Sequence, residues 1–346
     1  MKFKKPIFFI AISISLTNLL SPSFADAPTT ALACPPPASA PSDAGTLVLA
    51  AQSQQLTSTE WRIRQGCFKK YGLTIKTTPI SSSTIGFAGL ISKTYDLTAT
   101  TPVNLIQAKI NGGFPGLIVA PKHGYSAEEL IRAKEEPFFP GELLLQTVVI
   151  VKSDSKIKSW KDLNKKKIAI QNVQGADHAG VLLAMRESGI RNPELELLTT
   201  PGPQMIDALN RGDVDAVVAN DPIATTLIIG GARIVGYPQA YFAQAGSSIV
   251  YISTSEIASS KSRTLKIFQK ATLEINKLLN KKENEESFRK VIAEVTKITP
   301  EAAAKARLPL MMEKNVTINE LSYIPSKLKK VGFLKGRFEL GPILFR

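Results

Sequence analysis

WKDLNKKKIAIQNVQGADHAGVLLAMRESGIRNPELELLTTPGPQMIDALNRGDVDAVVANDP, residues 160–222, alternates short apolar runs with segments of helical periodicity. The predicted strands are Ile168–Ile170, Leu195–Leu198 and Asp215–Ala219, and the predicted helices between them are His178–Ser188 and Gln204–Arg211. A glycine follows each helix and ends it. Short connections in this β-α-β-α-β order predict an open parallel sheet, with functional loops at the carboxyl ends of its strands.

Short motifs in this stretch continue on both sides of it. They are Lys161-Asp162-Leu163, Gly175 at a helix start, Gly212-Asp213-Val214-Asp215-Ala216, Asp221-Pro222, Gly66–Leu73, Ser81–Thr84, Gly89–Lys93, Tyr95–Leu97 and Val331–Phe333. In this order they resemble the periplasmic solute-binding proteins of the nitrate, sulfonate and taurine importers and their thiamine-precursor relatives. The resemblance covers Gly45–Gly236 and a weaker match near the C-terminus, and the Ser81–Thr84 loop has serine where glycine is usual.

The resemblance implies an α/β fold of the type II periplasmic binding protein kind, with two doubly wound domains joined by a two-strand hinge. We expect domain I in residues 45–147 and 248–346, the second part mainly helical, and domain II in residues 148–247. The apolar runs Leu143–Val151 and Ser248–Ile252 are expected to pair as the two crossings. The later helices should pack on domain I, and they are Ser262–Leu279, Glu286–Val295, Pro300–Ala306 and Ile318–Val331.

The resemblance also implies capture of a small anionic or zwitterionic solute, such as a sulfonate, taurine, nitrate or a thiamine precursor. An ABC permease in the inner membrane is the expected partner, and a monomer without cofactor or metal is the expected state. Two alternatives stay open: an enzyme on the same fold, like the related pyrimidine synthases, and a periplasmic sensor that reports a ligand to a membrane partner. The synthases carry a cysteine-rich motif that this sequence lacks.

The first residues indicate export. Residues 1–25 have a basic start, an apolar run over Ile7–Leu20 and small residues near the end, which is typical of a cleavable secretory signal peptide. A retained membrane anchor needs about 20 apolar residues, and polar residues interrupt this shorter run. Residues 26–44 are rich in proline and alanine and predict an extended tail. The expected location is therefore the periplasm.

The net charge of +14 raises the alternative of a nucleic-acid partner. Cleavage after Ala25 would remove three lysines and no acids, which leaves +11. The remaining basic residues lie in short groups such as Lys165–Lys167, without interleaved aromatic residues or a known binding module. We interpret them as solvated faces and expect no nucleic-acid partner.

The chain has two cysteines, Cys34 and Cys67. In an exported protein a disulfide between them is one interpretation, and two unpaired thiols are the other. The residues before Cys34 resemble a lipoprotein processing box only weakly, because Ala31 stands where a large aliphatic residue is usual.

Candidate ligand-binding residues follow the predicted strands. Hydroxyls at the start of a helix are suited to an anion, although one would suffice as a helix cap, and an aromatic side chain near a strand end is either a cleft wall or core. We expect the strand ends to meet across one cleft, and the candidates are Gln54, Trp61, Ser82, Ser83, Thr84, Thr101, Gln174, Gly175, Ala176 and Asp177.

Asp221 is the last candidate and has two interpretations. It stands before Pro222, where related proteins often have tryptophan close by. A carboxylate that faces a closing cleft needs a partner, which would be an ammonium group of the ligand. The alternative is a cap on the following turn, a common role for aspartate in this position.

The sequence offers little for catalysis. It lacks the Gly-x-Ser-x-Gly, His-Glu-x-x-His and Cys-x-x-Cys motifs, and its two histidines, His123 and His178, fall in different expected domains. We interpret His178, at a helix start, as a surface or capping residue and expect that the protein is not an enzyme.

Overall fold

The structure is a computed structural model, and it describes residues 33–34, 42–137, 143–336 and 340–346. These residues all fall in one compact unit, Leu32–Arg346. The predicted signal peptide and most of the predicted tail lie outside the described residues. Among the described helices, none has both the length and the hydropathy of a membrane span.

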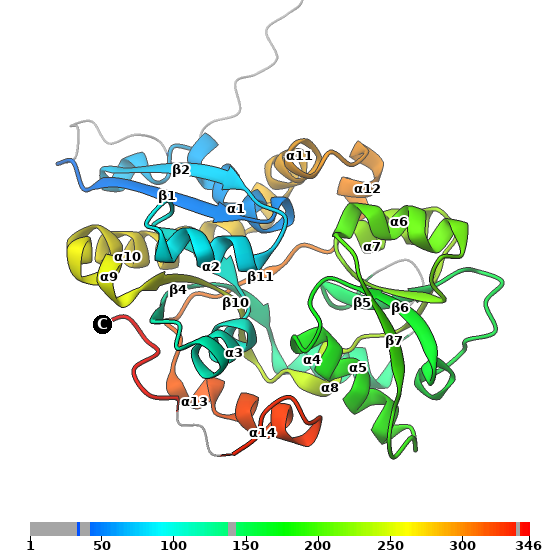
Figure 1. Ribbon diagram of the computed structural model, residues 1–346. Helices are drawn as coiled ribbons and strands as arrows, with labels where there is room; N and C mark the ends of the chain where they lie inside the picture. Colours follow the sequence, from blue (N-terminus) through cyan, green and yellow to red (C-terminus); the bar gives the residue numbers. More distant parts are fainter. Residues whose placement is uncertain (1–32, 35–41, 138–142, 337–339) are drawn as a thin grey trace, which may run out of the picture. The chain divides into compact units, whose positions relative to one another are not determined.

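The first of two sheets has six strands in the order β11-β4-β10-β3-β1-β2 (Figure 1). Strand β1 pairs in parallel with β2 and β3, whereas β10 runs antiparallel to β3 and β4. The bounds are Gly45–Ala51 for β1, Leu73–Pro79 for β2, Leu97–Thr100 for β3, Gly116–Tyr125 for β4, Gly246–Thr254 for β10 and Leu310–Met311 for β11. We call this sheet and the helices that share its core the first lobe.

The helices of the first lobe come from both ends of the chain. They are α1 (Ser53–Arg64), α2 (Ser83–Ile91), α3 (Pro102–Gly112), α9 (Ser255–Ser260), α10 (Ser262–Leu279), α11 (Glu285–Thr296), α12 (Pro300–Lys305), α13 (Ile318–Leu321) and α14 (Tyr323–Lys330). Helix α10 turns Leu265, Phe268 and Ile275 into the core that also holds the β1 residues Leu47 and Leu49. Helix α10 thus packs against the first sheet, whereas α11 packs on α1 and α12.

Local signals fix where several of these helices begin and end. At the start of α3 the Thr101 hydroxyl accepts from the Asn104 amide at 3.1 Å, and Pro102 occupies the first helical position. Gly113 ends the helix with φ 60°, a left-handed conformation that favours glycine. Thr299 and Pro300 begin α12 in the same way.

The second sheet has five strands in the order β7-β6-β8-β5-β9 (Figure 1, green). Strand β6 is parallel to β7 and β8, as the alternation in residues 160–222 predicts. The bounds are Thr147–Val151 for β5, Lys166–Ile170 for β6, Leu195–Thr199 for β7, Ala216–Asn220 for β8 and Arg233–Gly236 for β9. The helices of this second lobe are α4 (Ala127–Glu135), α5 (Ala176–Glu187), α6 (Gly202–Arg211), α7 (Ile223–Ile229) and α8 (Gln239–Phe242).

The expected α/β fold class is confirmed. Separate cores lie on the two faces of the second sheet, because β5 and β8 are covered on both sides and are apolar except at Thr147 and Asn220. The chain passes from the first sheet to the second between β4 and β5, and it returns between β9 and β10. The expected domain limits at residues 147 and 247 stay predictions. The limit at 247 falls close to the return passage, whereas α4 already packs in the core of the second lobe before residue 147.

The predicted pairing of Leu143–Val151 with Ser248–Ile252 is wrong. Strand β5 lies between β8 and β9 in the second sheet, and β10 lies between β4 and β3 in the first. Both runs are buried and β-branched, so their composition shows that they are strands without showing which strands they join. The helix predicted over Ile318–Val331 is also interrupted, since α13 ends at Leu321 and α14 begins at Tyr323.

Cys34 and Cys67 form a disulfide in the structure, with their Cα atoms 4.8 Å apart. Both residues are buried in the first-lobe core, and the Ala33 amide donates to the Gln65 side chain at 2.9 Å. The bridge closes a loop that contains β1 and α1. It therefore fastens the end of the tail to the first helix of the fold.

Candidate functional site

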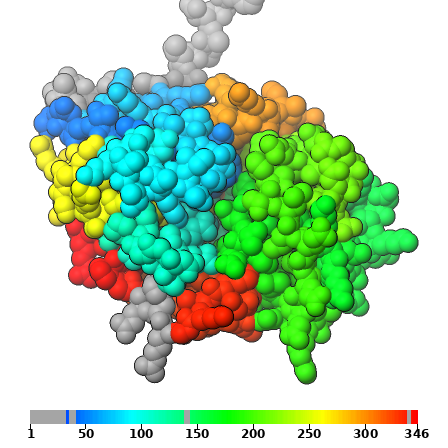
Figure 2. Space-filling model, viewed as in Figure 1, coloured from blue at the N-terminus to red at the C-terminus, as the bar shows by residue number. Residues whose placement is uncertain are grey.

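A pocket of about 90 Å³ lies between the two lobes and is lined by both. On the face shown in Figure 2, the cyan surface of the first lobe meets the green surface of the second, and the red α14 segment touches both. The Gln107 side chain on α3 donates to the Gln174 carbonyl before α5 at 2.8 Å, and Lys327 donates to the Tyr241 carbonyl at 2.8 Å. These bonds join the lobes around the pocket.

The first lobe contributes the residues that follow β1 and β3 and begin α2. The Asn104 amide donates to the Thr100 hydroxyl at 3.2 Å, and the Thr100 hydroxyl donates to that of Ser83 at 3.3 Å. Gln54 and Thr101 line the same wall. The parallel β1 and β3 bring these groups together because their carboxyl ends lie at the same edge of the sheet.

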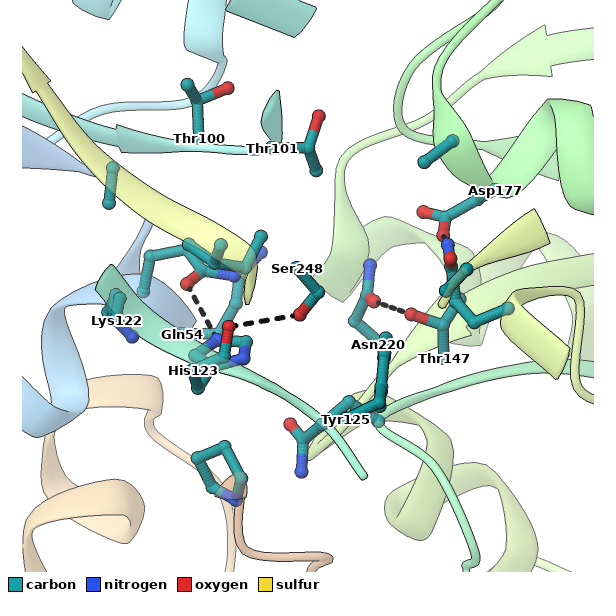
Figure 3. Close-up of a pocket in the computed structure, with 18 of the residues that line it drawn as sticks. Gln54, Thr100, Thr101, Lys122, His123, Tyr125, Thr147, Asp177, Asn220 and Ser248 are labelled. Atoms are coloured by element: carbon teal, nitrogen blue, oxygen red, sulfur yellow. Dashed lines mark hydrogen bonds between the residues drawn. The ribbon is translucent and has the colours of Figure 1, made fainter. Parts of the chain in front are cut away.

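The second lobe contributes a matching polar wall (Figure 3). Thr147 at the start of β5 donates to the Asn220 side-chain oxygen at 2.5 Å, and the Asn220 amide donates to the Gln171 side chain at 3.2 Å. Ala176 and Asp177, at the start of α5, complete the wall. Most side chains that face the pocket are thus neutral hydrogen-bonding groups, which is typical of sites for small polar solutes.

Strands β4 and β10 form the inner surface of the pocket. The Nε2 atom of His123 lies 3.3 Å from the Gln55 side-chain oxygen, and the Ser248 hydroxyl donates to the His123 carbonyl at 3.2 Å (Figure 3). Burial, and then the charges of Lys122 and Arg62, hold the pKa of His123 well below its usual range. The imidazole is therefore neutral at pH 7 and available as a hydrogen-bonding group.

The charged residues that line the pocket are Lys122, Asp177, Asp221 and Arg307, and Arg307 forms an ion pair with Glu129. Burial, followed by repulsion from Arg62, holds the pKa of Lys122 well below its usual range. Burial raises the pKa of the Asp177 carboxyl to about 6, and a hydrogen bond from Gln239 lowers it in part. Burial likewise raises the pKa of Asp221 to about 6.

Six of the candidate residues predicted from the sequence line the pocket. They are Gln54, Ser83, Thr101, Ala176, Asp177 and Asp221. The strand ends of the two lobes thus face one another across a single pocket.

Trp61 does not line the pocket, and its interpretation as a cleft wall is wrong. The side chain is fully buried in the first-lobe core, and its Nε1 atom donates to the Ser287 hydroxyl of α11 at 2.8 Å. Helical periodicity turns this position of α1 towards α11, whereas Gln54 and Gln55, at the start of α1, face the pocket.

Of the three candidates in the loop Ser82–Thr84, only Ser83 lines the pocket. Ser82 is the N-cap residue of α2 and Thr84 is exposed, so neither lines the pocket. Consecutive residues of a helix point about 100° apart, so only Ser83 can face the pocket from this turn. A ligand role for Ser82 and Thr84 receives no support.

Three residues around the start of α5 do not line the pocket, and they are Gln174, Gly175 and His178. Gln174 is exposed and uses its carbonyl in the contact with Gln107. Gly175 is the N-cap residue of α5, and His178 accepts from the Gln174 amide through Nδ1 at 3.0 Å. His178 thus has the predicted capping role, but it is buried and packs on Phe333 instead of lying at the surface.

Asp221 makes the contacts of the capping alternative. One carboxylate oxygen accepts from the Thr225 amide of α7 at 2.9 Å, and the other accepts from the Arg307 amide. Asp221 is buried, and its peptide bond to Pro222 is cis. Since both oxygens already bind amides of the protein, the ammonium role predicted for this residue loses its main support.

Sequence reasoning missed the lining residues on β4, including Lys122, His123 and Tyr125. The apolar run Leu117–Ala120 predicts a strand that ends before Pro121 and the polar pair. A signal did exist, because a lysine and a histidine between apolar residues and a glycine are unusual in a buried strand. Asn220 and Thr147 were missed because nothing local distinguishes an ordinary strand-end residue from a binding one.

Asp177 gives a prediction on stability. We expect Asp177→Asn to raise the free energy of unfolding of the ligand-free protein at pH 7.5 by about 2 kcal/mol. The folded pKa of about 6 exceeds the usual 3.8, so the ionised carboxylate costs stability above pH 6, and this cost disappears as the pH falls below 4. Urea unfolding of protein and variant at several pH values measures the difference.

The parent protein and Asp177→Asn must both be measured, because the titration of His178 changes the stability with pH in the opposite direction to that of Asp177. Burial lowers the pKa of His178 to about 4, so the folded protein loses stability as the pH falls below 6.5. Both proteins contain His178, and its contribution cancels in the difference. A difference that stays constant between pH 4 and 7.5 would contradict the prediction.

A family model described as NMT1/THI5 like matches residues 145–279. The matched segment contains all five strands of the second sheet, β5 to β9, and it continues through β10 and α10 of the first lobe. No curated protein sequence matches the chain.

Three solved structures share the fold. The alkanesulfonate-binding protein SsuA from Xanthomonas axonopodis pv. citri, bound to MOPS, has a TM-score of 0.68 at 16% identity, over 87% of this chain and 98% of that chain. The periplasmic nitrate-binding protein NrtA from Synechocystis PCC 6803 has a TM-score of 0.57 at 14% identity, over 76% and 70%. A DszB variant in complex with biphenyl-2-sulfinic acid has a TM-score of 0.52 at 13% identity, over 82% and 90%.

These three proteins are described with different ligands, so the fold alone does not specify the solute. The resemblance seen in the sequence is confirmed for the fold. The described chain thus has the two-lobed fold of the periplasmic binding proteins, and the part of it that resembles the NMT1/THI5-like family is residues 145–279.

Proposed function

We propose that this protein is an extracytoplasmic solute-binding protein for ABC import. It captures a small anionic or zwitterionic solute between its lobes and delivers it to a permease in the inner membrane. The observation that carries the proposal is the pocket, to which both lobes contribute hydrogen-bonding side chains at the ends of their strands. A solute bound there would hold the lobes together, and a permease could recognise that closed state.

The comparisons support this role. SsuA and NrtA are described as binding proteins, and the sulfonate and nitrate of their descriptions are small anions. A periplasmic location, export through residues 1–25 and a monomeric state belong to the same proposal. The protein would bind its solute without converting it and would need no cofactor.

A ligand screen tests the proposal. We expect one or more small solutes to raise the thermal unfolding temperature of the processed protein, since a ligand that binds only the folded state stabilises it. The screen should contain alkanesulfonates, taurine, nitrate and pyrimidine precursors of thiamine, and calorimetry should follow each hit. Mass spectrometry after prolonged incubation should recover the ligand unchanged, whereas a converted ligand would support the enzyme alternative.

Asn220 offers a site-directed version of this test. We expect Asn220→Ala to weaken binding of the best ligand by about tenfold, because one good hydrogen-bonding group is worth about 1.4 kcal/mol. Asn210→Ala, at an exposed position on α6, is the matched control and should bind as the parent does. The pocket is not the binding site if both variants bind equally well.

A further inference from the structure

Lys122 is a buried cation in the centre of the molecule. Its side chain lines the pocket from β4, and the residue is only 1% exposed. Its carbonyl accepts from the Asn276 side chain at 3.3 Å and from the Met312 amide at 3.2 Å. The backbone at Lys122 is thus held in place by α10 and by the residue after β11.

The ammonium group of Lys122 has no counterion among the residues that the structure describes. Among the described residues, no hydrogen-bond acceptor or carboxylate lies within bonding distance of its Nζ atom. A buried ammonium without a partner is costly, and the cost is removed either by loss of the proton or by arrival of an anion.

A second buried cation increases the need for negative charge. Arg62 on α1 is fully buried, and repulsion between Arg62 and Lys122 contributes to the depressed lysine pKa. The Arg62 guanidinium donates to the Tyr251 hydroxyl at 2.6 Å and to the Asn276 side-chain oxygen, and both partners are neutral. Its Nε atom has no partner among the described residues. Two cations therefore lie near one another in the first lobe, and neither forms an ion pair with a described residue.

The opposite side of the pocket carries the complementary charge. Asp177 faces the pocket from the start of α5 in the second lobe, and Figure 3 shows it across the pocket from Lys122. Its carboxylate accepts from the Gln239 amide, its single hydrogen bond among the described residues. Unlike Asp221, it keeps an oxygen that no backbone amide occupies.

We propose that the pocket binds a zwitterion, with its anionic group on Lys122 and its ammonium group on Asp177. The inference rests on the proposed function and narrows it to small amino-sulfonates or amino-carboxylates. It also places the anionic group on β4 instead of on the serine loop at the start of α2. A zwitterion would neutralise both unpaired groups and draw together the lobes that carry them.

Matched pairs of probes test the two ends separately. Taurine has an ammonium group where propane-1-sulfonate has a methyl group. β-Alanine and butanoate differ in the same way. We expect each zwitterion to bind the parent protein more tightly than its partner, in calorimetry at pH 7.5. We expect Lys122→Met to weaken binding of the zwitterion that binds best by at least about 30-fold, which is typical when one partner of a buried charge pair is removed.

Asp177→Asn should weaken binding of the zwitterion by at least about tenfold. Binding of the matched simple anion should stay unchanged or become tighter. Lys270→Met, at an exposed position on α10, is the control for removal of one positive charge. Lys122→Met should unfold at the parent temperature or above it, because an apolar side chain of similar length replaces an unpaired charge. Loss of binding can then be separated from loss of the fold.

Two results would overturn the assignment while leaving the proposed function intact. One is tight binding of any screened solute together with no binding of taurine or β-alanine at millimolar concentration. The other is a zwitterion whose affinity survives Lys122→Met or Asp177→Asn within a few-fold. Failure of every solute in the screen would instead remove the proposed function itself.

Discussion

Trp61→Ala is expected to lower the free energy of unfolding by about 3–5 kcal/mol, the usual cost of removing a large aromatic side chain from a core. Trp61 is fully buried, and it joins α1 to α11, two helices far apart in the sequence. Because no part of it faces the pocket, ligand affinity measured below the unfolding transition should stay within about twofold of the parent. Urea unfolding and calorimetry on the same samples measure both quantities.

Trp61→Phe is the matched variant. It keeps most of the aromatic volume and loses the Nε1 bond to Ser287, so we expect a cost of about 1–2 kcal/mol. If Trp61→Ala instead left the stability unchanged and abolished binding, the side chain would be a cleft wall after all, and its placement in the core would be wrong.

Removal of the disulfide is expected to cost about 3 kcal/mol in the Cys34→Ala/Cys67→Ala double variant. The bridge spans 33 residues, and without it the unfolded chain gains the freedom of that loop. Both cysteines are also buried in the first-lobe core, where alanine fills less space. Urea unfolding of the double variant against the oxidised parent measures the loss.

The chemical state of the two cysteines can be checked directly. Intact-mass measurement after alkylation should show no modified thiol before reduction and two modified thiols after it. Two modified thiols without reductant, or a lipid mass on Cys34, would contradict the disulfide. The single variant Cys67→Ala serves as a control because it leaves one thiol that must react.

Asp221 connects the lobes even though it makes no ligand contact that the structure supports. Its carboxylate holds the Arg307 amide, and the Gln146 side chain donates to the Arg307 carbonyl. The segment between α12 and β11 is thereby fastened to the second lobe where it lines the pocket. Any change of angle between the lobes must move or break these bonds, so this segment is a third connection beside the two passages of the chain between the sheets.

The sequence was sufficient for elements whose signals are local. The helix Ser262–Leu279 has the bounds in the structure that the sequence predicts, and the strands and helices of residues 160–222 differ only at their ends. Periodicity, capping residues and glycines act within a few residues of the chain, so they can be read in order. The alternation of these elements was enough to predict a parallel sheet and the α/β class.

The arrangement of distant elements required the tertiary structure. β5 and β10 have similar composition, yet they join different sheets. Likewise, Trp61 and Gln54 lie on the same helix, and only the packing of α11 shows which of them is core and which faces the pocket. Strand partners and helix faces depend on residues tens to hundreds of positions away, and no local pattern records them.

The pocket likewise contains residues that the sequence predicted and residues that only the tertiary structure revealed. The strand-end rule led from the sequence to Ser83, Thr101 and Asp177, because parallel strands bring their carboxyl ends to one edge whatever their side chains are. That rule does not find Lys122, which lies within β4 and not at the end of a strand. Its importance depends on the proximity of Arg62 and on the lack of an ion pair with any described residue. Burial and the distance between charges are properties of the folded chain, and they set the cost of an unpaired charge.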